Sequence, residues 1–384
     1  MTVKTGLDVL LERGLFKDKV VGLITNHTGR GSDLRQNVDL MLAEGYRIGA
    51  IFSPEHGIYG EFQDGEAIAD AKDPRTGIPI FSLYGSGMTP TPESLRGLDA
   101  LVFDIQDIGA RHYTYPATLI NSMEAAARSA VSFVVLDRPN PIGGIAVEGN
   151  VAAPDRLSFV CPAPTAIRHG LTIGELSLLA AEWKGLPAPS IVTMDGWERG
   201  MWFDETGLPW VPPSPNAPTL SMAALYPGTC FMEGVNLSEA RGTALPFEMV
   251  GAPWIDGEKL ADVMRAMNLP GVLWRPVRFR PSTGKWTGES CGGVQAHVAD
   301  RNALRPVELG VRLLFAVRDL YPEKLEPVSP TEPSESAHYH MDLLAAGPEL
   351  RETLFGGQQP DRLLEEWREQ AARFEAERKK FFIY

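Results

Sequence analysis

Cysteine is scarce in this 384-residue chain. Its three cysteines, Cys161, Cys230 and Cys291, are odd in number and widely spaced. That pattern fits neither a disulfide framework nor a C-x-x-C metal or redox site, so we expect buried free thiols. The segment "HYH" at 338–340 could place two imidazoles on one face of a strand, but no third ligand of matching spacing accompanies them. We therefore predict no metal site.

Positive charge is also sparse. The 36 Lys and Arg residues face 49 Asp and Glu residues, for a net charge of −13, and the basic residues form no stripe. This excludes the phosphate-neutralising surface of a nucleic-acid binder. No apolar run approaches the roughly 20 residues of a membrane span, and "MTVKTGLDVLLERGLF" lacks the features of a secretory signal. We predict no nucleic-acid partner, no membrane insertion and a cytoplasmic location, and the sequence leaves the oligomeric state open.

Three nucleotide-binding or catalytic signatures are missing. The chain has no G-x-x-x-x-G-K-[ST] loop, no G-x-G-x-x-G after its first strand and no G-x-S-x-G nucleophile elbow. We therefore predict no cofactor, and a doubly wound fold would not by itself indicate nucleotide binding here.

The first half alternates short apolar runs with amphipathic segments. The runs at 19–26, 47–53, 78–85, 99–106, 132–140 and 189–197 are apolar on both faces, as in strands covered by helices on two sides. Helical patterns occupy 32–44, 117–130 and 172–184, with a helical turn at 91–95, and Glu175 three residues after Thr172 predicts a capping box. The alternation predicts an α/β fold with a doubly wound, mostly parallel sheet.

A proline-dense segment at 207–220 interrupts this pattern and marks the predicted domain boundary. We expect one domain at 1–210 and a second, smaller α/β domain at 211–384. The second should contain a polar loop at 233–248, strands around 271–281 and 292–300, a solvated loop at 322–336, and helices at 307–320 and 360–380.

Polar residues gather where the predicted strands end. In open α/β sheets the ligand crevice lies beyond the carboxyl ends of the strands. A single carboxylate there most often caps a helix or pairs with an arginine, but coincidence at several ends favours a site. The residues at these ends are Asn26, His27, Glu55, His56, Asp104, Gln106, Asp107, Arg111, His112, Tyr113, Asp137, Arg138, Asn140 and Asp195.

Glu55, in "IFSPEHGIYG", is the first candidate for catalysis. Pro54 fixes the backbone before it, and Gly57 and Gly60 let the loop pass close to a ligand. A carboxylic acid there can serve as a general acid. An extended backbone would point the neighbouring His56 elsewhere, so we expect it to hydrogen-bond the loop.

The segment "DIQDIGARHYTYP" is denser in polar groups. Asp104 could be a second carboxylate or could orient Arg111, and Tyr113 and Tyr115 offer a stacking surface or a phenolic proton donor. We expect Asp107 to shape the turn with Gly109.

Three further groups have a structural and a functional interpretation. Asn140 either contacts a hydroxylated ligand or holds a proline turn. The cluster Glu233, Asn236, Glu239 and Arg241 could equally be a surface loop hydrogen-bonded to itself. Glu289 and His297 lie in "GESCGGVQAHV", and we expect no special task for the histidine.

Several long segments together resemble a known family. "GLITNHTG", "FSPEHGIYG", "DALVFDIQDIGARHYTY", "FVVLDRPNPIGG", "WVPPSPNAPTL" and "YPGTCFMEGVNLSEARGTALPFEMVGAPWID" are similar, in this order, to the exo-acting β-N-acetylmuramidases of bacterial peptidoglycan recycling. The resemblance covers nearly the whole chain. It implies release of non-reducing terminal N-acetylmuramic acid (MurNAc) from β-1,4-linked MurNAc-GlcNAc fragments. The implied site is a cleft between a Rossmann-like domain and the smaller domain.

The resemblance also implies roles for residues. Glu55 matches the glutamate favoured as catalytic, and a partner at the anomeric carbon would be Asp104, Tyr113 or the substrate's 2-acetamido group, in that order. Arg111, Arg138 and Arg241 are candidates to hold the lactyl carboxylate. The remaining predicted substrate-binding residues are Asn26, His27, His56, Gln106, His112, Asn140, Asn216, Asn236 and Glu239.

Many relatives carry export signals, whereas this chain begins directly at the domain, so we expect it to act on imported fragments.

Two other functions compete with the glycosidase. A non-catalytic muropeptide or amino-sugar binding protein would use the same cleft with aromatic and amide side chains. An acyl or amide hydrolase is disfavoured by the missing nucleophile elbow and metal triad.

Overall fold

The computed structural model describes residues 2–63, 65–85, 87–329 and 338–384. The predicted loop at 322–336 therefore lies outside the described residues from position 330 onward. Among the described residues, no helix is long and apolar enough to cross a membrane.

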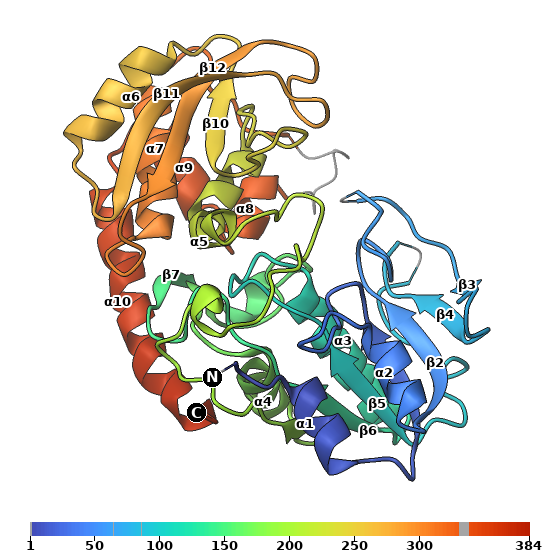
Figure 1. Cartoon of the computed structure of the whole chain (residues 1–384). Coiled ribbons are helices and arrows are strands. Elements are labelled where there is room, and N and C mark those ends of the chain that lie inside the picture. Colours follow the sequence, from blue (N-terminus) through green and yellow to red (C-terminus); the bar gives the residue numbers. More distant parts are fainter. Residues whose placement is uncertain (1, 64, 86, 330–337) are drawn as a thin grey trace.

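The first half is built on a seven-stranded sheet (Figure 1). Its strand order is β3-β4-β2-β1-β5-β6-β9, and all neighbours are parallel except the β3–β4 pair at one edge. The strands are β1 (Val20–Thr25), β2 (Arg47–Ser53), β3 (Ala71–Lys72), β4 (Pro79–Ser82), β5 (Ala100–Asp104), β6 (Ser132–Leu136) and β9 (Ser190–Val192). All six strands predicted for this half are confirmed, and most end earlier than predicted, where polar residues begin.

Helices cover both faces of this sheet, because its strands are apolar on both sides. Helices α1 (Gly6–Arg13) and α2 (Asn37–Ala43) share one core with Val21 and Leu23 of β1. Helices α3 (Tyr115–Arg128) and α4 (Ile173–Lys184) share another with Ile24 and Phe103. The predicted α/β architecture with a mostly parallel sheet is confirmed.

Local signals explain where these helices begin. The predicted capping box of α4 is present, with the Thr172 hydroxyl and the Glu175 carboxylate each accepting the other residue's backbone N–H. Helix α1, which was not predicted, begins with the same arrangement at Thr5 and Asp8. Helix α2 begins five residues later than predicted, because the preceding residues form a turn in which Leu34 has a φ of 68°.

The second half contains a separate antiparallel sheet with the order β10-β12-β11. Its strands are β10 (Met249–Ala252), β11 (Val272–Phe279) and β12 (Cys291–Val298), and its helices are α5 (Leu220–Thr229), α6 (Gly257–Ala266), α7 (Pro306–Leu320), α8 (His340–Leu344), α9 (Glu349–Phe355) and α10 (Asp361–Glu377). The predicted strands β11 and β12 and helices α7 and α10 are confirmed. A strand at 338–340 is wrong, because α8 begins at His340.

Short elements complete the chain. They are a two-stranded sheet of β7 (Glu148–Val151) and β8 (Ala166–Arg168), and the 3₁₀ turns η1 (Pro154–Arg156), η2 (Phe203–Glu205), η3 (Cys230–Gly234) and η4 (Arg378–Phe381).

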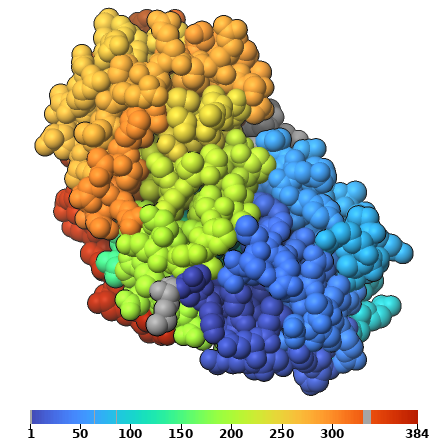
Figure 2. All heavy atoms as spheres, viewed as in Figure 1, coloured from blue at the N-terminus to red at the C-terminus, as the bar shows by residue number. Residues whose placement is uncertain are grey.

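Two segments join the halves. The proline-rich segment at 207–220 fills the space between them (Figure 2), and its carbonyl groups at Pro212 and Pro213 bind His27 at 2.7 Å and the Tyr115 hydroxyl at 2.5 Å. Helix α10 leaves the second half, packs along β7 and brings the C-terminus close to the N-terminus (Figure 1). There the Tyr384 hydroxyl donates to Asp137 at 2.9 Å. The predicted division at residue 210 stays a prediction.

Candidate active site

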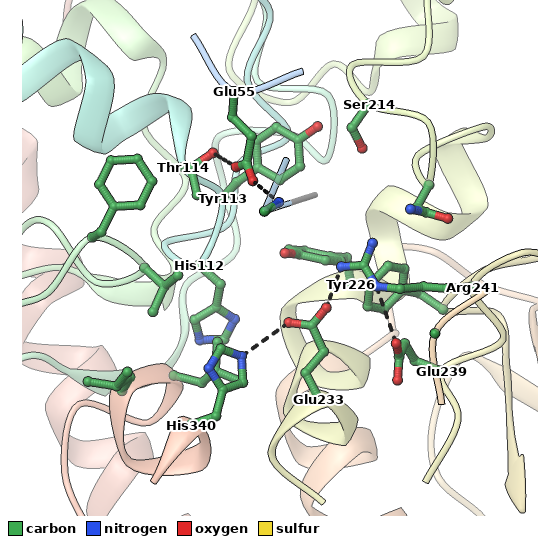
Figure 3. A pocket seen from close by; sticks show the side chains of 18 of the residues that line it. Glu55, His112, Tyr113, Thr114, Ser214, Tyr226, Glu233, Glu239, Arg241 and His340 are labelled. Atoms are coloured by element: carbon green, nitrogen blue, oxygen red, sulfur yellow. Dashed lines mark hydrogen bonds and ion pairs between the residues drawn. The ribbon is translucent and has the colours of Figure 1, made fainter. Parts of the chain in front are cut away.

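A cavity of about 660 Å³ lies between the two halves and takes side chains from both. The first half contributes Glu55, His56, Tyr84, His112, Tyr113, Thr114 and Phe159. The second half and the proline-rich segment contribute Ser214, Asn216, Tyr226, Glu233, Glu239, Arg241, Phe247, Lys285, His338 and His340. Figure 3 shows Glu55 on one side of this cavity and Glu233, Glu239 and Arg241 on the opposite side.

Glu55 occupies a sharp turn just beyond β2. The backbone reverses at His56 and Gly57, whose φ angles are 71° and 75°. A positive φ is uncommon for a residue with a side chain, although histidine adopts it more readily than most. The turn leaves Glu55 only 7% exposed. Its Oε2 accepts a hydrogen bond from the Thr114 hydroxyl at 2.6 Å, and its Oε1 accepts one from the Gly65 N–H at 3.2 Å.

The loop after Glu55 is held by two histidines. His56 Nδ1 lies 2.9 Å from the Phe62 carbonyl oxygen, so His56 binds its own loop as expected. The expected extended backbone is wrong, since the chain turns at this residue. Gly60, with a φ of 72°, packs so closely on His27 that an added Cβ would lie 2.3 Å from the ring nitrogen Nδ1. The glycine therefore accommodates His27, and burial lowers the pKa of that imidazole.

Aromatic rings form one wall of the cavity. Tyr113 packs edge-on against Tyr115 and Tyr226, with ring centroids 4.9 and 5.9 Å apart, and Tyr226 packs in the same way against Phe247. Burial raises the pKa of Tyr113 well above its ordinary value, so its hydroxyl stays protonated. Burial, followed by the nearby Arg111 charge, lowers the pKa of His112 to about 3, so its ring stays neutral.

The wall opposite Glu55 carries a group of ion pairs, called here the Arg241 network: Glu233, Glu239, Arg241, Lys285 and His340. The Arg241 guanidinium binds the Glu233 carboxylate and lies 3.2 Å from Glu239 Oε1, with the Phe247 ring 5.0 Å away. Lys285 lies 3.0 Å from Glu239 Oε2 and also donates to the carbonyls of Met232 and Val235. Three segments distant in sequence therefore meet here.

Glu233 is held ionised within this network. Its Oε2 lies 3.5 Å from His340 Nε2. Burial alone would raise its pKa, but the Arg241 guanidinium and the His340 ring outweigh burial and hold the pKa below the ordinary value. The alternative of a surface loop for this segment is wrong, because Glu239 and Ala240 are buried.

Two predicted catalytic or binding residues lie below the cavity, as a buried pair. Asp104, fully buried at the end of β5, accepts from Arg138 Nε at 2.6 Å and from Asn37 Nδ2 at 2.7 Å. Arg138 also donates to the Arg30 carbonyl. Neither residue lines the cavity, because each satisfies the charge of the other within the protein.

Arg111 also lies outside the cavity lining, in a buried position between the halves. Its guanidinium donates to the carbonyls of Asn150 and Thr165 at 2.8 Å each, to Asn150 Oδ1 at 3.0 Å and to the Leu344 carbonyl at 3.2 Å. Burial lowers its pKa. Its hydrogen bonds join β7 to α8.

Predicted amide ligands mostly bind the protein itself. Asn140 donates to the Leu171 carbonyl and accepts from Ile142 N, which is the proline-turn interpretation. The side chains of Asn26, Gln106 and Asn236 likewise bind neighbouring groups of the chain and do not line the cavity. Asp107 accepts from Gly109 N at 2.8 Å, which confirms the predicted turn.

Seven predicted site residues therefore meet around the cavity: Glu55, His56, His112, Tyr113, Asn216, Glu239 and Arg241. Sequence reasoning missed Thr114, Ser214, Tyr226 and Lys285. The sequence analysis named Glu233 only within a cluster that could also have been a surface loop. It considered His338 and His340 only as metal ligands. A position next to Tyr113 was the one available signal for Thr114.

Among the described residues, no three His, Cys, Asp or Glu side chains form a metal-binding group. The three cysteines are buried and free of disulfide bonds, as expected.

A carboxyl group held against a cavity with tyrosine and phenylalanine walls suits protonation of a sugar linkage, as in a glycosidase. Comparison with family models narrows the assignment of the chain to one family. The N-terminal model of exo-β-N-acetylmuramidase NamZ matches residues 21–221, and the C-terminal model matches residues 224–384. The chain belongs to the exo-β-N-acetylmuramidase NamZ family, and the predicted family and enzyme class are confirmed.

Individual relatives agree with this assignment. Over 386 residues the chain is 40% identical to the peptidoglycan β-N-acetylmuramidase NamZ of Bacillus subtilis (strain 168), covering all of this chain and 91% of that protein. Two solved structures of DUF1343 family proteins from Bacteroides fragilis NCTC 9343 are also similar. Their TM-scores are 0.90 and 0.77 at 36% and 28% identity, and each comparison covers 100% of this chain and 99% of the other. These matches favour the glycosidase over a non-catalytic binding protein.

Proposed function

We propose that the chain releases non-reducing terminal MurNAc from β-1,4-linked MurNAc-GlcNAc fragments of peptidoglycan, with Glu55 as the general acid. The observation that carries this proposal is the position of Glu55. Its carboxylate lies in a cavity shared by both halves and is oriented by the Thr114 hydroxyl and the Gly65 N–H. In the reaction Glu55 gives its proton to the glycosidic oxygen as the C1–O bond breaks, and the bonding electron pair stays with that oxygen.

The group that attacks the anomeric carbon is the substrate's own 2-acetamido oxygen. Asp104 does not line the cavity and is paired with Arg138, and the raised pKa of Tyr113 disfavours a phenolate nucleophile. Substrate assistance is an established alternative to a protein nucleophile in glycoside hydrolysis. It requires an acid on the leaving-group side, which Glu55 supplies.

Arg241 holds the lactyl carboxylate that distinguishes MurNAc from GlcNAc. Of the three arginines considered for this role, it alone lines the cavity, since Arg111 and Arg138 are committed to groups within the protein. A planar guanidinium can bind a carboxylate through two hydrogen bonds. Replacing it in Arg241→Ala should weaken the discrimination between MurNAc and GlcNAc glycosides, and unchanged discrimination would place the lactyl group elsewhere.

A chromogenic β-MurNAc glycoside tests the catalytic proposal. The wild-type protein should release the chromophore, and Glu55→Gln should lower kcat by about 10²- to 10⁴-fold, the usual contribution of a general acid. Binding of MurNAc should persist in that variant, and its thermal unfolding should match the wild type. Binding without release by the wild type would instead support the non-catalytic sugar-binding protein.

Three finer points of the fold and location belong to the same proposal. Counted along the chain without β3, the parallel strands follow the order 3-2-1-4-5-6, which supports a Rossmann-like first domain. The gap between the two family models, at residues 222–223, supports a domain division close to the proline-rich segment. A cytoplasmic location belongs to the same proposal, and cell fractionation would test it.

A further inference from the structure

Among the described residues that line the cavity, Glu55 is the one carboxylate contributed by the first half, and the acidic residues that face it belong to the Arg241 network in the second half (Figure 3). The two carboxylates there, Glu233 and Glu239, differ in their contacts and in the exposed fraction of their side chains. Glu239 lies 3.2 Å from Arg241 and 3.0 Å from Lys285, and its side chain is only 4% exposed. The Glu233 side chain is 18% exposed, and its Oε2 meets the His340 ring at 3.5 Å. Of the two carboxylates, Glu233 is therefore the more exposed to a ligand in the cavity.

The charged and titratable groups around Glu233 favour its ionised form. Arg241 binds Oε1 from the following loop, and His340 faces Oε2 from the start of α8. The Cys230 thiol lies 3.7 Å from Oε2 within η3, and burial raises the pKa of that thiol well above its ordinary value, so it stays a neutral donor. Glu233 is thus held ionised on the wall opposite Glu55.

Attack by a 2-acetamido group creates a positive charge that has to be stabilised. The acetamido oxygen bonds to C1 as the C1–O bond to the leaving sugar breaks, and the leaving oxygen takes the Glu55 proton. The product is a cyclic oxazolinium ion whose positive charge lies on the N–H side of the new ring. Water then bonds to C1 as the bond between C1 and the acetamido oxygen breaks, which restores the acetamido group, and the water gives a proton back to Glu55. An ionised carboxylate at the N–H stabilises this intermediate electrostatically.

We propose that Glu233 is a second catalytic residue. Its carboxylate accepts a hydrogen bond from the acetamido N–H group and stabilises the oxazolinium ion. This inference rests on the proposed function. It agrees with the placement of Arg241, because the acetamido and lactyl groups occupy neighbouring ring carbons, C2 and C3, and Glu233 and Arg241 are neighbouring side chains.

The decisive comparison is between Glu233→Gln and Glu239→Gln. Both remove one carboxylate from Arg241, so any effect that comes only from loosening that arginine should appear in both. We expect Glu233→Gln to lower kcat by about 10²- to 10³-fold, as for loss of one preorganised electrostatic group, and Glu239→Gln to lower it by less than about tenfold. Equal losses in the two variants would overturn the proposal.

A thiazoline derivative of MurNAc, which mimics the cyclic intermediate, provides a readout that a purely structural role would not move. Glu233→Gln should weaken binding of this thiazoline at least about tenfold more than binding of MurNAc, and an unchanged ratio of the two affinities would overturn the proposal. If Glu233→Gln does not fold, Glu233→Asp keeps the charge and should retain the thiazoline preference at reduced kcat. Loss of that preference in a folded Glu233→Asp would count against it.

The two proposals fail in different ways. A wild-type protein that releases no MurNAc, or a fully active Glu55→Gln, removes the proposed function itself. Normal behaviour of both, with a fully active Glu233→Gln, removes only the role of Glu233.

Discussion

Thr114 offers a sharp test of how the acid is positioned. Its hydroxyl donates to Glu55 Oε2 at 2.6 Å, a hydrogen bond that joins residues 59 positions apart. The change Thr114→Val keeps the shape and removes the donor. A hydrogen bond to a charged group contributes about 1.5–3 kcal/mol. If the transition state loses all of this stabilisation, kcat/KM falls by roughly 10- to 100-fold, since about 1.4 kcal/mol corresponds to a factor of ten.

The matched control is Thr114→Ser, which keeps the hydroxyl and should stay within a few-fold of the wild type. Rates on a chromogenic MurNAc glycoside would be measured for both variants, together with their thermal unfolding. Equal rates for the valine and serine variants would refute the assignment of Thr114 as the residue that orients Glu55. A loss of rate in both would show that the methyl packing, and not the hydroxyl, matters.

Two further predictions concern buried groups away from the acid. Arg111→Met should lower the free energy of unfolding by about 3 kcal/mol or more, because it leaves buried acceptors of Asn150, Thr165 and Leu344 without donors. Urea denaturation would measure this loss of stability, and a denaturation midpoint equal to that of the wild type would contradict the prediction. Discrimination between MurNAc and GlcNAc glycosides should not change in this variant. Burial raises the pKa of Asp107 from 3.8 to about 7, so the folded state binds its proton more tightly than the unfolded state does. Stability from this group is full below about pH 4 and is lost as pH rises to about 7, by a few kcal/mol at about 1.4 kcal/mol per pKa unit. The stability of the wild type relative to Asp107→Asn should fall across that range, and parallel curves would contradict the burial effect.

Local sequence patterns predicted most of the first half. Strands such as β1 and β5 are buried on both faces, and their unbroken apolar runs are visible without knowledge of their neighbours. The capping box of α4 depends on Thr172 and Glu175, only three residues apart. Glu55 was found because an apolar strand ends in a polar turn, and that transition is also local.

Ion pairing between distant segments was not predictable in the same way. Arg111 and Arg138 bind groups away from the cavity, whereas Arg241 lines the cavity while it pairs with Glu233 and Glu239. The difference depends on which carbonyls and carboxylates the fold brings near each guanidinium.

The sequence by itself therefore determined the strands, several helices and the position of Glu55 just beyond a strand, because each depends on residues close together in the chain. Only the tertiary structure decided which polar residues share the cavity. Thr114 reaches Glu55 across 59 positions, and His340 reaches Glu233 across 107. Each of these contacts joins distant segments of one half at the cavity, and its strength comes from burial and proximity that no short segment contains.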